Sequence, residues 1–237
     1  MQQAYKSIRL FESGALEWFS HIHPLTPLLF WGPVTAGLIG YGVTADHLSL
    51  AVMFGLALGG LLSWSLAEYV LHRFVFHFEP QGAFQERLVF IMHGIHHADP
   101  GDPTRLVMAP SVSIILALIF YPTFRAILGH AWVNPFFGFF ILGYLVYDYT
   151  HYAVHHFTPR TAMGKALKQN HMIHHYVDHD SRWGVSSPLW DWVFGTLHEP
   201  RPAQKLQVSR SSRASRGSRE SREAKKAVKA GHKLNPA

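Results

Sequence analysis

The chain of 237 residues is long enough for one domain of ordinary size, and 48% of its residues are hydrophobic while only 15% are charged, against about 25% charged in typical soluble domains. It has no cysteine, which excludes disulfides, thiolate metal sites and cysteine nucleophiles. Residues 1–200 carry 10 Lys/Arg and 13 Asp/Glu, whereas residues 201–237 carry 11 and 2. The net charge of +6 therefore belongs to the tail and does not indicate a nucleic-acid-binding core.

The first segment, residues 1–23, mixes apolar residues such as Leu10 and Trp18 with charged residues such as Lys6 and Glu17. This mixture predicts an interfacial segment that lies on a membrane surface.

Four apolar runs follow. Residues 24–43 come near the roughly 20 residues that a membrane-spanning helix needs. Residues 48–71 would cover about 36 Å as a helix, more than the roughly 30 Å hydrocarbon core, so the residues after them should emerge at the far interface. Residues 106–121 and 135–149 are each short for a full span, and Arg125 is the single charged residue between them. We expect this pair to form a membrane hairpin that dips in and returns.

The basic residues predict the orientation of these runs. Outside the tail, nine Lys/Arg lie on the histidine-rich side of the runs and Arg125 alone lies on the other. The positive-inside rule then places both termini and the histidine-rich segments in the cytoplasm.

The remaining segments are polar or aromatic. Residues 78–105 are irregular except for a short helix expected to begin near Phe84 and to end in the turn-forming residues 99–103. Residues 183–199 are aromatic-rich and are expected to pack over the histidine site. The composition of residues 201–237 predicts a disordered basic tail. Attraction to anionic lipid heads is a second reading of the tail, and its lack of aromatic residues argues against RNA binding.

Histidines cluster in four boxes with the spacings H-x4-H, H-x2-H-H, H-x3-H-H and H-x2-H-H. Histidine is the commonest metal ligand in proteins. The boxes contain His72, His77, His93, His96, His97, His151, His155, His156, His171, His174 and His175. So many imidazoles exceed what one ion can use, and we predict a two-metal site at a membrane surface.

Helix geometry supports convergence within the last three boxes, because residues three or four apart share a helix face. His72 and His77 would lie roughly 140° apart on a regular helix. Either the helix ends between them or a local bulge turns it. His156 would face about 100° away from His155, and its part in the site stays undecided.

The ligand type limits the chemistry. An all-nitrogen site suits Fe, Zn, Cu or Ni, but zinc has no redox chemistry. Attack on an unactivated C–H bond requires O2 activation, which favours iron. Glu68 lies one turn before His72 and Asp148 nearly one turn before His151, so each could accept an N–H from a ligand histidine. Solvation of a helix end or a salt bridge is the alternative role for both carboxylates.

Five strings carry a resemblance to a known family: LHRFVFH (71–77), HGIHHADPGDPTRLV (93–107), GYLVYDYTHYAVHH (143–156), NHMIHHY (170–176) and PLWDWVFGTL (188–197). The chain resembles the fatty acid hydroxylase superfamily of membrane enzymes, and within it the fatty acid 2-hydroxylases. Sterol and carotenoid relatives share the general boxes, whereas the first two strings are more specific for fatty acyl 2-hydroxylation.

The resemblance implies an all-α integral membrane fold of four transmembrane helices, with a cytoplasmic helical cap that carries a dimetal centre, here within residues 24–200. It also implies ten ligands shared between two metals. His72, His77, His93, His97 and His174 would hold one metal, and His96, His151, His155, His171 and His175 the other. Enzymes of this kind are taken as di-iron, although zinc can occupy the sites in isolated protein.

The implied reaction is O2-dependent 2-hydroxylation of a fatty acyl chain, free or lipid-linked. C2 is also the carbon that a metal centre just outside the hydrocarbon edge reaches most easily. A sibling enzyme acting on a sterol, a carotenoid or another acyl position is the nearest alternative. A metal carrier without catalysis is a third reading, which the scarcity of polar groups along the spans opposes. No fused haem domain precedes residue 24, so we expect a separate electron donor and a bacterial inner-membrane enzyme.

Overall fold

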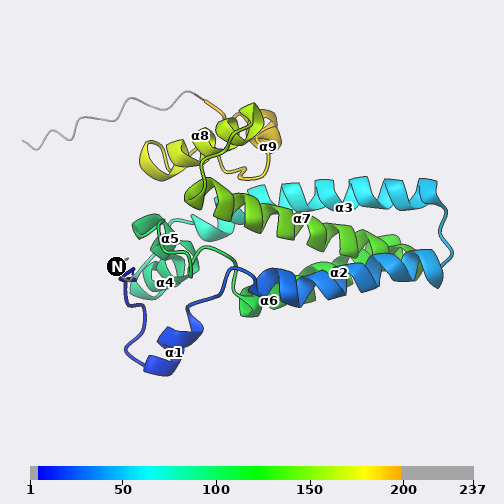
Figure 1. Ribbon diagram of the computed structural model, residues 1–237, viewed down its shortest axis with the longest axis horizontal. Coiled ribbons are helices and arrows are strands. Elements are labelled where there is room, and N and C mark those ends of the chain that lie inside the picture. The colour runs from blue at the N-terminus through cyan, green and yellow to red at the C-terminus, as the bar shows by residue number, and fades with distance from the viewer. Residues whose placement is uncertain (1–4, 199–237) are drawn as a thin grey trace, which may run out of the picture. The chain divides into compact units, whose positions relative to one another are not determined.

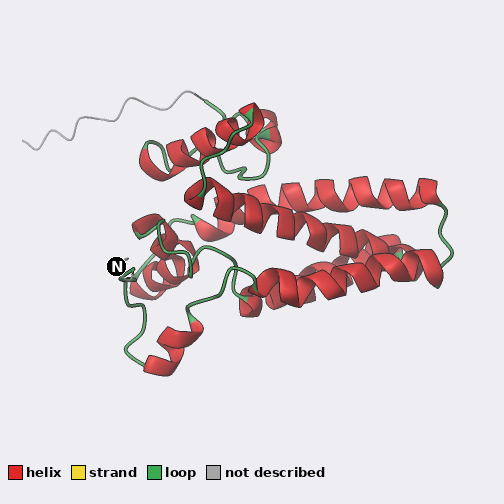
Figure 2. Ribbon diagram, viewed as in Figure 1, coloured by secondary structure: helices red, strands yellow, loops and turns green. Residues whose placement is uncertain are grey.

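The computed structural model describes residues 5–198, and every regular element within that range is helical (Figures 1 and 2). The predicted basic tail, residues 201–237, lies outside the described range. The elements are α1 (Gly14–Phe19), α2 (Thr26–Thr44), α3 (Leu50–Val70), η1 (Leu71–Phe76), α4 (Ala83–Val89), η2 (Phe90–Gly94), α5 (Ile95–Ala98), α6 (Pro110–Leu128), α7 (His130–His156), α8 (Ala162–Tyr176) and α9 (Leu189–Val193). The segments η1 and η2 are π-helical.

Four long helices, α2, α3, α6 and α7, lie side by side, and the short helices gather at one end of them (Figure 1). The central helix is α7, because α2, α3 and α6 all pack against it. Every histidine box lies in η1, η2, α5, α8 or the last turns of α7, or next to one of these elements. The bundle therefore brings all four boxes to the same end.

Trp64 on α3 is the centre of the packing between α3 and α7. Its ring lies edge-on to Phe140 at 5.2 Å and to Tyr144 at 5.3 Å between centroids. Two glycines allow this approach: a Cβ at Gly143 would lie 2.6 Å from Trp64 Cβ, and a Cβ at Gly60 would lie 2.5 Å from a carbonyl oxygen of α7. Small residues let membrane helices pack this closely.

The predicted hairpin of residues 106–149 is longer than expected. Helix α6 continues past Pro122 and ends at Leu128, and α7 begins at His130, before Pro135. Only Gly129 separates the two helices, with a φ of 76° that favours glycine. The predicted runs stopped at residue 121 and began again at residue 135, but packing against neighbouring helices lets a helix continue past a proline that lacks a backbone donor. At 19 and 27 residues, the helices are about 28 and 40 Å long.

Two helical stretches are long and apolar enough to cross a membrane, judged by length and composition alone. The first is Leu50–Phe76, which consists of α3 and η1. The second is α6. Only 28% of the most apolar part of Leu50–Phe76 and 6% of that of α6 are buried inside the protein. A core helix of a soluble protein is, in contrast, mostly buried. The all-helical fold is therefore as predicted, and two of the four predicted spans meet this criterion among the described residues.

Candidate metal centre

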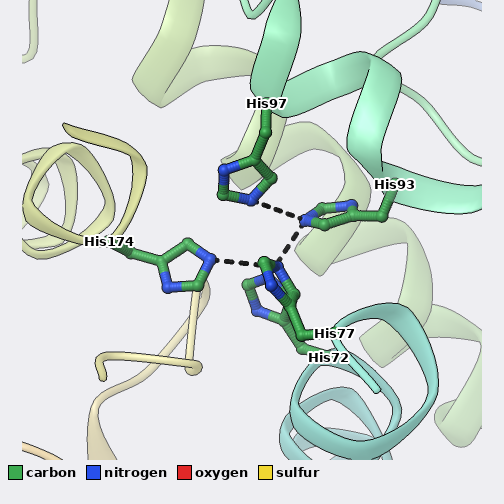
Figure 3. Close-up of side chains that lie close together, drawn as sticks. All are labelled: His72, His77, His93, His97 and His174. Atoms are coloured by element: carbon green, nitrogen blue, oxygen red, sulfur yellow. Dashed lines mark hydrogen bonds between the residues drawn. The ribbon is translucent and has the colours of Figure 1, made fainter. Parts of the chain in front are cut away.

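Five histidines from separate segments converge where the short helices gather (Figure 3). One ring nitrogen from each lies within 4.8 Å of the others. This first group consists of His72, His77, His93, His97 and His174. It draws on η1 and the residue after it, on η2, on α5 and on α8.

A second group of five meets the same condition beside the first. It consists of His96, His151, His155, His171 and His175, which come from α5, α7 and α8. The two groups match the division that the family resemblance implies. Whether these residues ligate metal is not tested by their position and stays a prediction.

Helical spacing explains how the boxes divide. Pairs four residues apart stay in one group: His93 with His97, His151 with His155, and His171 with His175. The neighbour of such a pair faces about 100° away, and so His96 and His174 enter the opposite group. The boxes therefore link the two groups, and the rings of His97 and His175 stack at 4.1 Å across them.

The π-helix η1 answers the question of the H-x4-H box. In a π-helix residue i bonds to residue i+5, so residues five apart come to lie over one another. His72 and His77 consequently bring their ring centroids to 5.1 Å. Both readings open from the sequence apply: the helix turns into π geometry at Leu71, and it ends at Phe76, directly before His77.

The distances between ring nitrogens fit a bound cation. Nε2 of His93 lies 3.2 Å from Nε2 of both His72 and His97, as the dashed lines in Figure 3 mark. In the second group the Nε2 atoms of His155 and His171 are 2.8 Å apart. Imidazole nitrogens bind transition metals at about 2.0–2.1 Å, which puts ligands at right angles about 3 Å apart. Two imidazoles can share one proton, and five converging nitrogens could be held together by one metal cation.

Backbone carbonyls orient two imidazoles of the first group. His72 Nδ1 lies 2.5 Å from the Trp183 carbonyl, and His174 Nδ1 lies 2.8 Å from the Ser181 carbonyl. A carbonyl only accepts, so each Nδ1 carries the proton and each Nε2 presents its lone pair to the centre of the group.

Burial keeps the imidazoles neutral. Desolvation, assisted by repulsion between neighbouring rings, lowers the pKa of His93, His96 and His171 well below the ordinary 6.5. Desolvation likewise lowers the pKa of His77 to about 4 and that of His174 to about 3. Only neutral imidazole binds metal, so these side chains are in the binding form at neutral pH.

The two carboxylates predicted to accept an N–H from a histidine make other contacts. Glu68 accepts hydrogen bonds from the backbone N–H groups of Val185 (2.6 Å) and Ser186 (2.9 Å). Asp148 accepts from the backbone N–H of Met108 (3.1 Å) and from the Tyr144 hydroxyl (3.2 Å). Both are buried, but Glu68 faces the loop of residues 181–186 and Asp148 faces the segment before α6, and within residues 5–198 neither is hydrogen-bonded to one of the ten grouped histidines.

Two residues near the site behave differently from the ten. The His156 ring lies 4.5 Å from that of Tyr152 in a tilted arrangement, and His156 belongs to neither group, as its 100° offset from His155 allows. His179, which the sequence analysis did not single out, lies 5.4 Å from the His97 ring. No spacing rule could place it, because a turn separates it from α8.

The orienting residues of 181–191 were also not foreseen. The aromatic segment does pack over the site, since the Trp183 ring lies 4.9 Å from that of His77 and 5.1 Å from that of His174. The Trp183 and Ser181 carbonyls are invisible to sequence patterns, because every residue has one. Asp191 could have been recognised, because a charged residue between two tryptophans in an aromatic segment indicates a buried polar contact, and Asp191 is buried.

A cavity of about 330 Å³ joins both histidine groups to an apolar space. It reaches His93 of the first group and His96 and His151 of the second. Its walls come from residues 10–22, from η1 and η2, and from residues 105–112. The volume lies at the lower end of the range of about 300–1,000 Å³ that is usual for ligand pockets.

Arg105 fixes the N-terminal wall of this cavity. Its guanidinium lies 2.5 Å from Glu17 Oε1 and donates to the Ser20 hydroxyl at 3.1 Å. The backbone N–H of Ile22 also donates to the Thr104 carbonyl at 2.7 Å. The predicted interfacial segment therefore forms part of the cavity, while its Trp18 side chain stays exposed.

Comparison with known proteins agrees with this arrangement. The sequence model of the fatty acid hydroxylase family matches residues 57–196, and this range includes all ten grouped histidines. The chain belongs to the fatty acid hydroxylase family. The matched range contains α6, α7, the π-helices and the loop of residues 181–186.

Individual relatives extend the match. The dihydroceramide fatty acyl 2-hydroxylase FAH1 of Arabidopsis thaliana is 35% identical over 199 residues, which cover 84% of each chain. The human fatty acid 2-hydroxylase is 38% identical over 227 residues, 87% of this chain and 61% of the human one. A solved structure of full-length scs7p, with only the hydroxylase domain visible, has a TM-score of 0.74 and 33% identity, and the match covers 79% of this chain and 71% of that one.

Proposed function

We propose that this membrane hydroxylase inserts one oxygen atom from O2 at C2 of a fatty acyl chain, free or lipid-linked. The observation that carries the proposal is the apolar cavity that opens onto both five-histidine groups. The relatives named as fatty acid 2-hydroxylases support the same acyl substrate and the same carbon.

The cavity would position the substrate by its lining. Apolar side chains such as Phe76, Ile91 and Leu106 suit an acyl chain. Polar groups, among them Arg105 and Ser20, lie together at the N-terminal wall and suit the carbonyl end of a lipid. A chain held between them presents the carbon next to the carbonyl near His93, His96 and His151, and a fixed geometry of this kind selects which C–H bond reacts.

We assign iron to the two groups in the working enzyme, with zinc able to bind in its place. All ten grouped residues offer imidazole nitrogen, a donor that suits both metals. The bound iron would supply the O2 activation that C–H oxidation needs. The protein contributes neutral imidazoles, of which His72 and His174 are oriented by carbonyls.

Hydroxylation of a C–H bond by O2 yields one alcohol and one water and consumes two electrons and two protons. We propose that a separate redox partner delivers these electrons. This partner and the lipid substrate are the two partners that the reaction requires.

We also propose that α2, α3, α6 and α7 all span the membrane. Each has at least 19 residues, or about 28 Å of helix, and they lie side by side in Figure 1. The cap of short helices would face the cytoplasm, because the basic residues gather on that side. Residues 24–198 then act as one membrane hydroxylase domain with residues 5–23 at the interface, and a bacterial inner membrane is the proposed location.

The test is the product. Cells that express the chain, supplied with O2 and an electron donor, should accumulate acyl lipids heavier by one oxygen, and fragmentation should place the hydroxyl at C2. A double bond, or a hydroxyl well down the chain, would assign the protein to a sibling reaction.

A further inference from the structure

The loop of residues 181–186 contacts the first histidine group and contains no ligand itself. Its Trp183 and Ser181 carbonyls accept from the Nδ1–H of His72 and His174. Those two residues lie on different elements, η1 and α8. One loop therefore sets the ring orientation of two of the five first-group ligands.

Two buried carboxylates hold this loop. Asp191 accepts from the backbone N–H groups of Trp183 and Gly184, both at 2.8 Å, one with each oxygen. Glu68 Oε1 accepts from the next two N–H groups, those of Val185 and Ser186. Four consecutive backbone donors are thus bound by side chains from α9 and α3, so the backbone of the loop is tied to both helices.

The loop has little room to move. A Cβ at Gly184 would lie 2.1 Å from the Ser187 carbonyl oxygen and 2.9 Å from Asp191 Oδ2. Asp191 and Ser181 are fully buried, and Trp183 is nearly so.

The second group lacks this support. The Nδ1 atoms of His151, His171 and His175 are buried and have no hydrogen-bond partner within residues 5–198. The two groups offer similar donors to a metal, but only the first has ligands oriented by a fixed loop.

We propose that residues 181–186 form a template that aims His72 and His174 at the first metal, and that Asp191 is the positioning residue that holds this template, with Glu68 as a second anchor. The consequence is that the first group retains its metal longer than the second. The inference rests on the proposed metal centre and adds that the two metals differ in how tightly they are retained.

The geometry distinguishes two amide substitutions of similar size. In Asp191→Asn, one of the two oxygens becomes an NH2 group. Whichever way the amide is turned, this NH2 faces either the Trp183 N–H or the Gly184 N–H, and that backbone donor loses its acceptor. In Glu68→Gln, the carbonyl can stay on the Val185 and Ser186 N–H groups, and the NH2 can donate to the Ser186 hydroxyl, which contacts Oε2. Both variants replace a carboxyl group by an amide, but loss of the template is expected only in the first.

The experiment measures metal per folded chain, and its release to a chelator, after the full-length protein is loaded with iron(II) or zinc. Wild type and Glu68→Gln should hold about two metals, one for each group. Asp191→Asn should release one metal at least about ten-fold faster, the lower end of the usual effect of outer-shell partners. Asp102→Asn is the control, because Asp102 is also a buried aspartate that accepts a backbone N–H, but it lies on another loop.

A variant of the second histidine group identifies which metal Asp191→Asn releases. His175→Ala removes a second-group ligand and should leave the first metal in place, whereas adding Asp191→Asn to it should make that remaining metal labile. The inference is overturned if Asp191→Asn keeps wild-type release, or if Asp191→Asn and Glu68→Gln accelerate both metals equally. A wild type without metal would instead overturn the proposed function.

If Asp191→Asn does not fold, the wild type provides the test. Its metals should leave in two phases, and His175→Ala should retain only the slow one. Release in one phase, or loss of the slow phase in His175→Ala, would contradict the template.

Discussion

Glu17 joins the N-terminal segment to the cavity wall. Its Oε2 accepts from the backbone N–H groups of Leu10 and Phe11, both at 2.9 Å, and its Oε1 contacts the Arg105 guanidinium. Desolvation alone would raise the pKa of this carboxyl. The two N–H groups and Arg105 outweigh it and lower the pKa from 4.5 to about 2.

This shift predicts a pH dependence. Because the folded pKa lies below the unfolded one, Glu17 stabilises the segment fully above pH 4.5, and this contribution disappears as the pH falls through about 2. At pH 7, Glu17→Gln should increase hydrogen exchange of residues 8–20, and the difference from wild type should shrink between pH 4.5 and 2. A difference that stays constant down to pH 2 would show that the ion pair does not hold the segment.

Residue spacing predicted most of the site at this scale. The i, i+4 pairs, such as His93 with His97, follow from helix periodicity alone. The π-turn that brings His77 to His72 and the helix end at Phe76 could be stated only as alternatives, because spacing does not show that both occur. Asp191 and the Trp183 carbonyl were missed, since they act through backbone contacts that connect α3, α8 and α9.

At the scale of elements, α3 and α7 touch through glycine. Gly60 faces the backbone of α7, where a Cβ would meet the Phe136 oxygen at 2.5 Å, whereas Gly55, on the same helix, has nothing within 4 Å. The two positions therefore form a matched pair for testing the packing.

Alanine at these positions should have opposite effects. Gly55→Ala should stabilise the protein by about 0.5–1 kcal/mol, because alanine favours a helix interior. Gly60→Ala must separate α3 from α7 and should cost about 1–3 kcal/mol. Thermal unfolding in detergent measures both, and a Gly60→Ala protein as stable as wild type would show that the helices are not in close contact there.

Helix existence was predictable from the apolar runs, but helix ends were not. The apolar runs stopped before Pro122 and began at Pro135, whereas α6 and α7 contain these two prolines in their interiors. The tertiary packing of α6 on α7, which sequence patterns do not contain, lets both helices continue past them.

At the scale of the whole molecule, the fold brings ten histidines from η1, η2, α5, α7 and α8 to one end of a bundle. The family resemblance implied their division into two groups, while periodicity alone left it open. The cavity against these groups could not be predicted, because it forms between residues 10–22, 105–112 and α7, which are distant in sequence.

The most direct test of the account is the metal content of the purified full-length protein, measured together with its activity. We expect about two metals per chain, one for each five-histidine group. His97→Ala should lose the first-group metal and His175→Ala the second-group metal, each with loss of hydroxylation. A fully active wild type that holds one metal or fewer would contradict the dimetal centre.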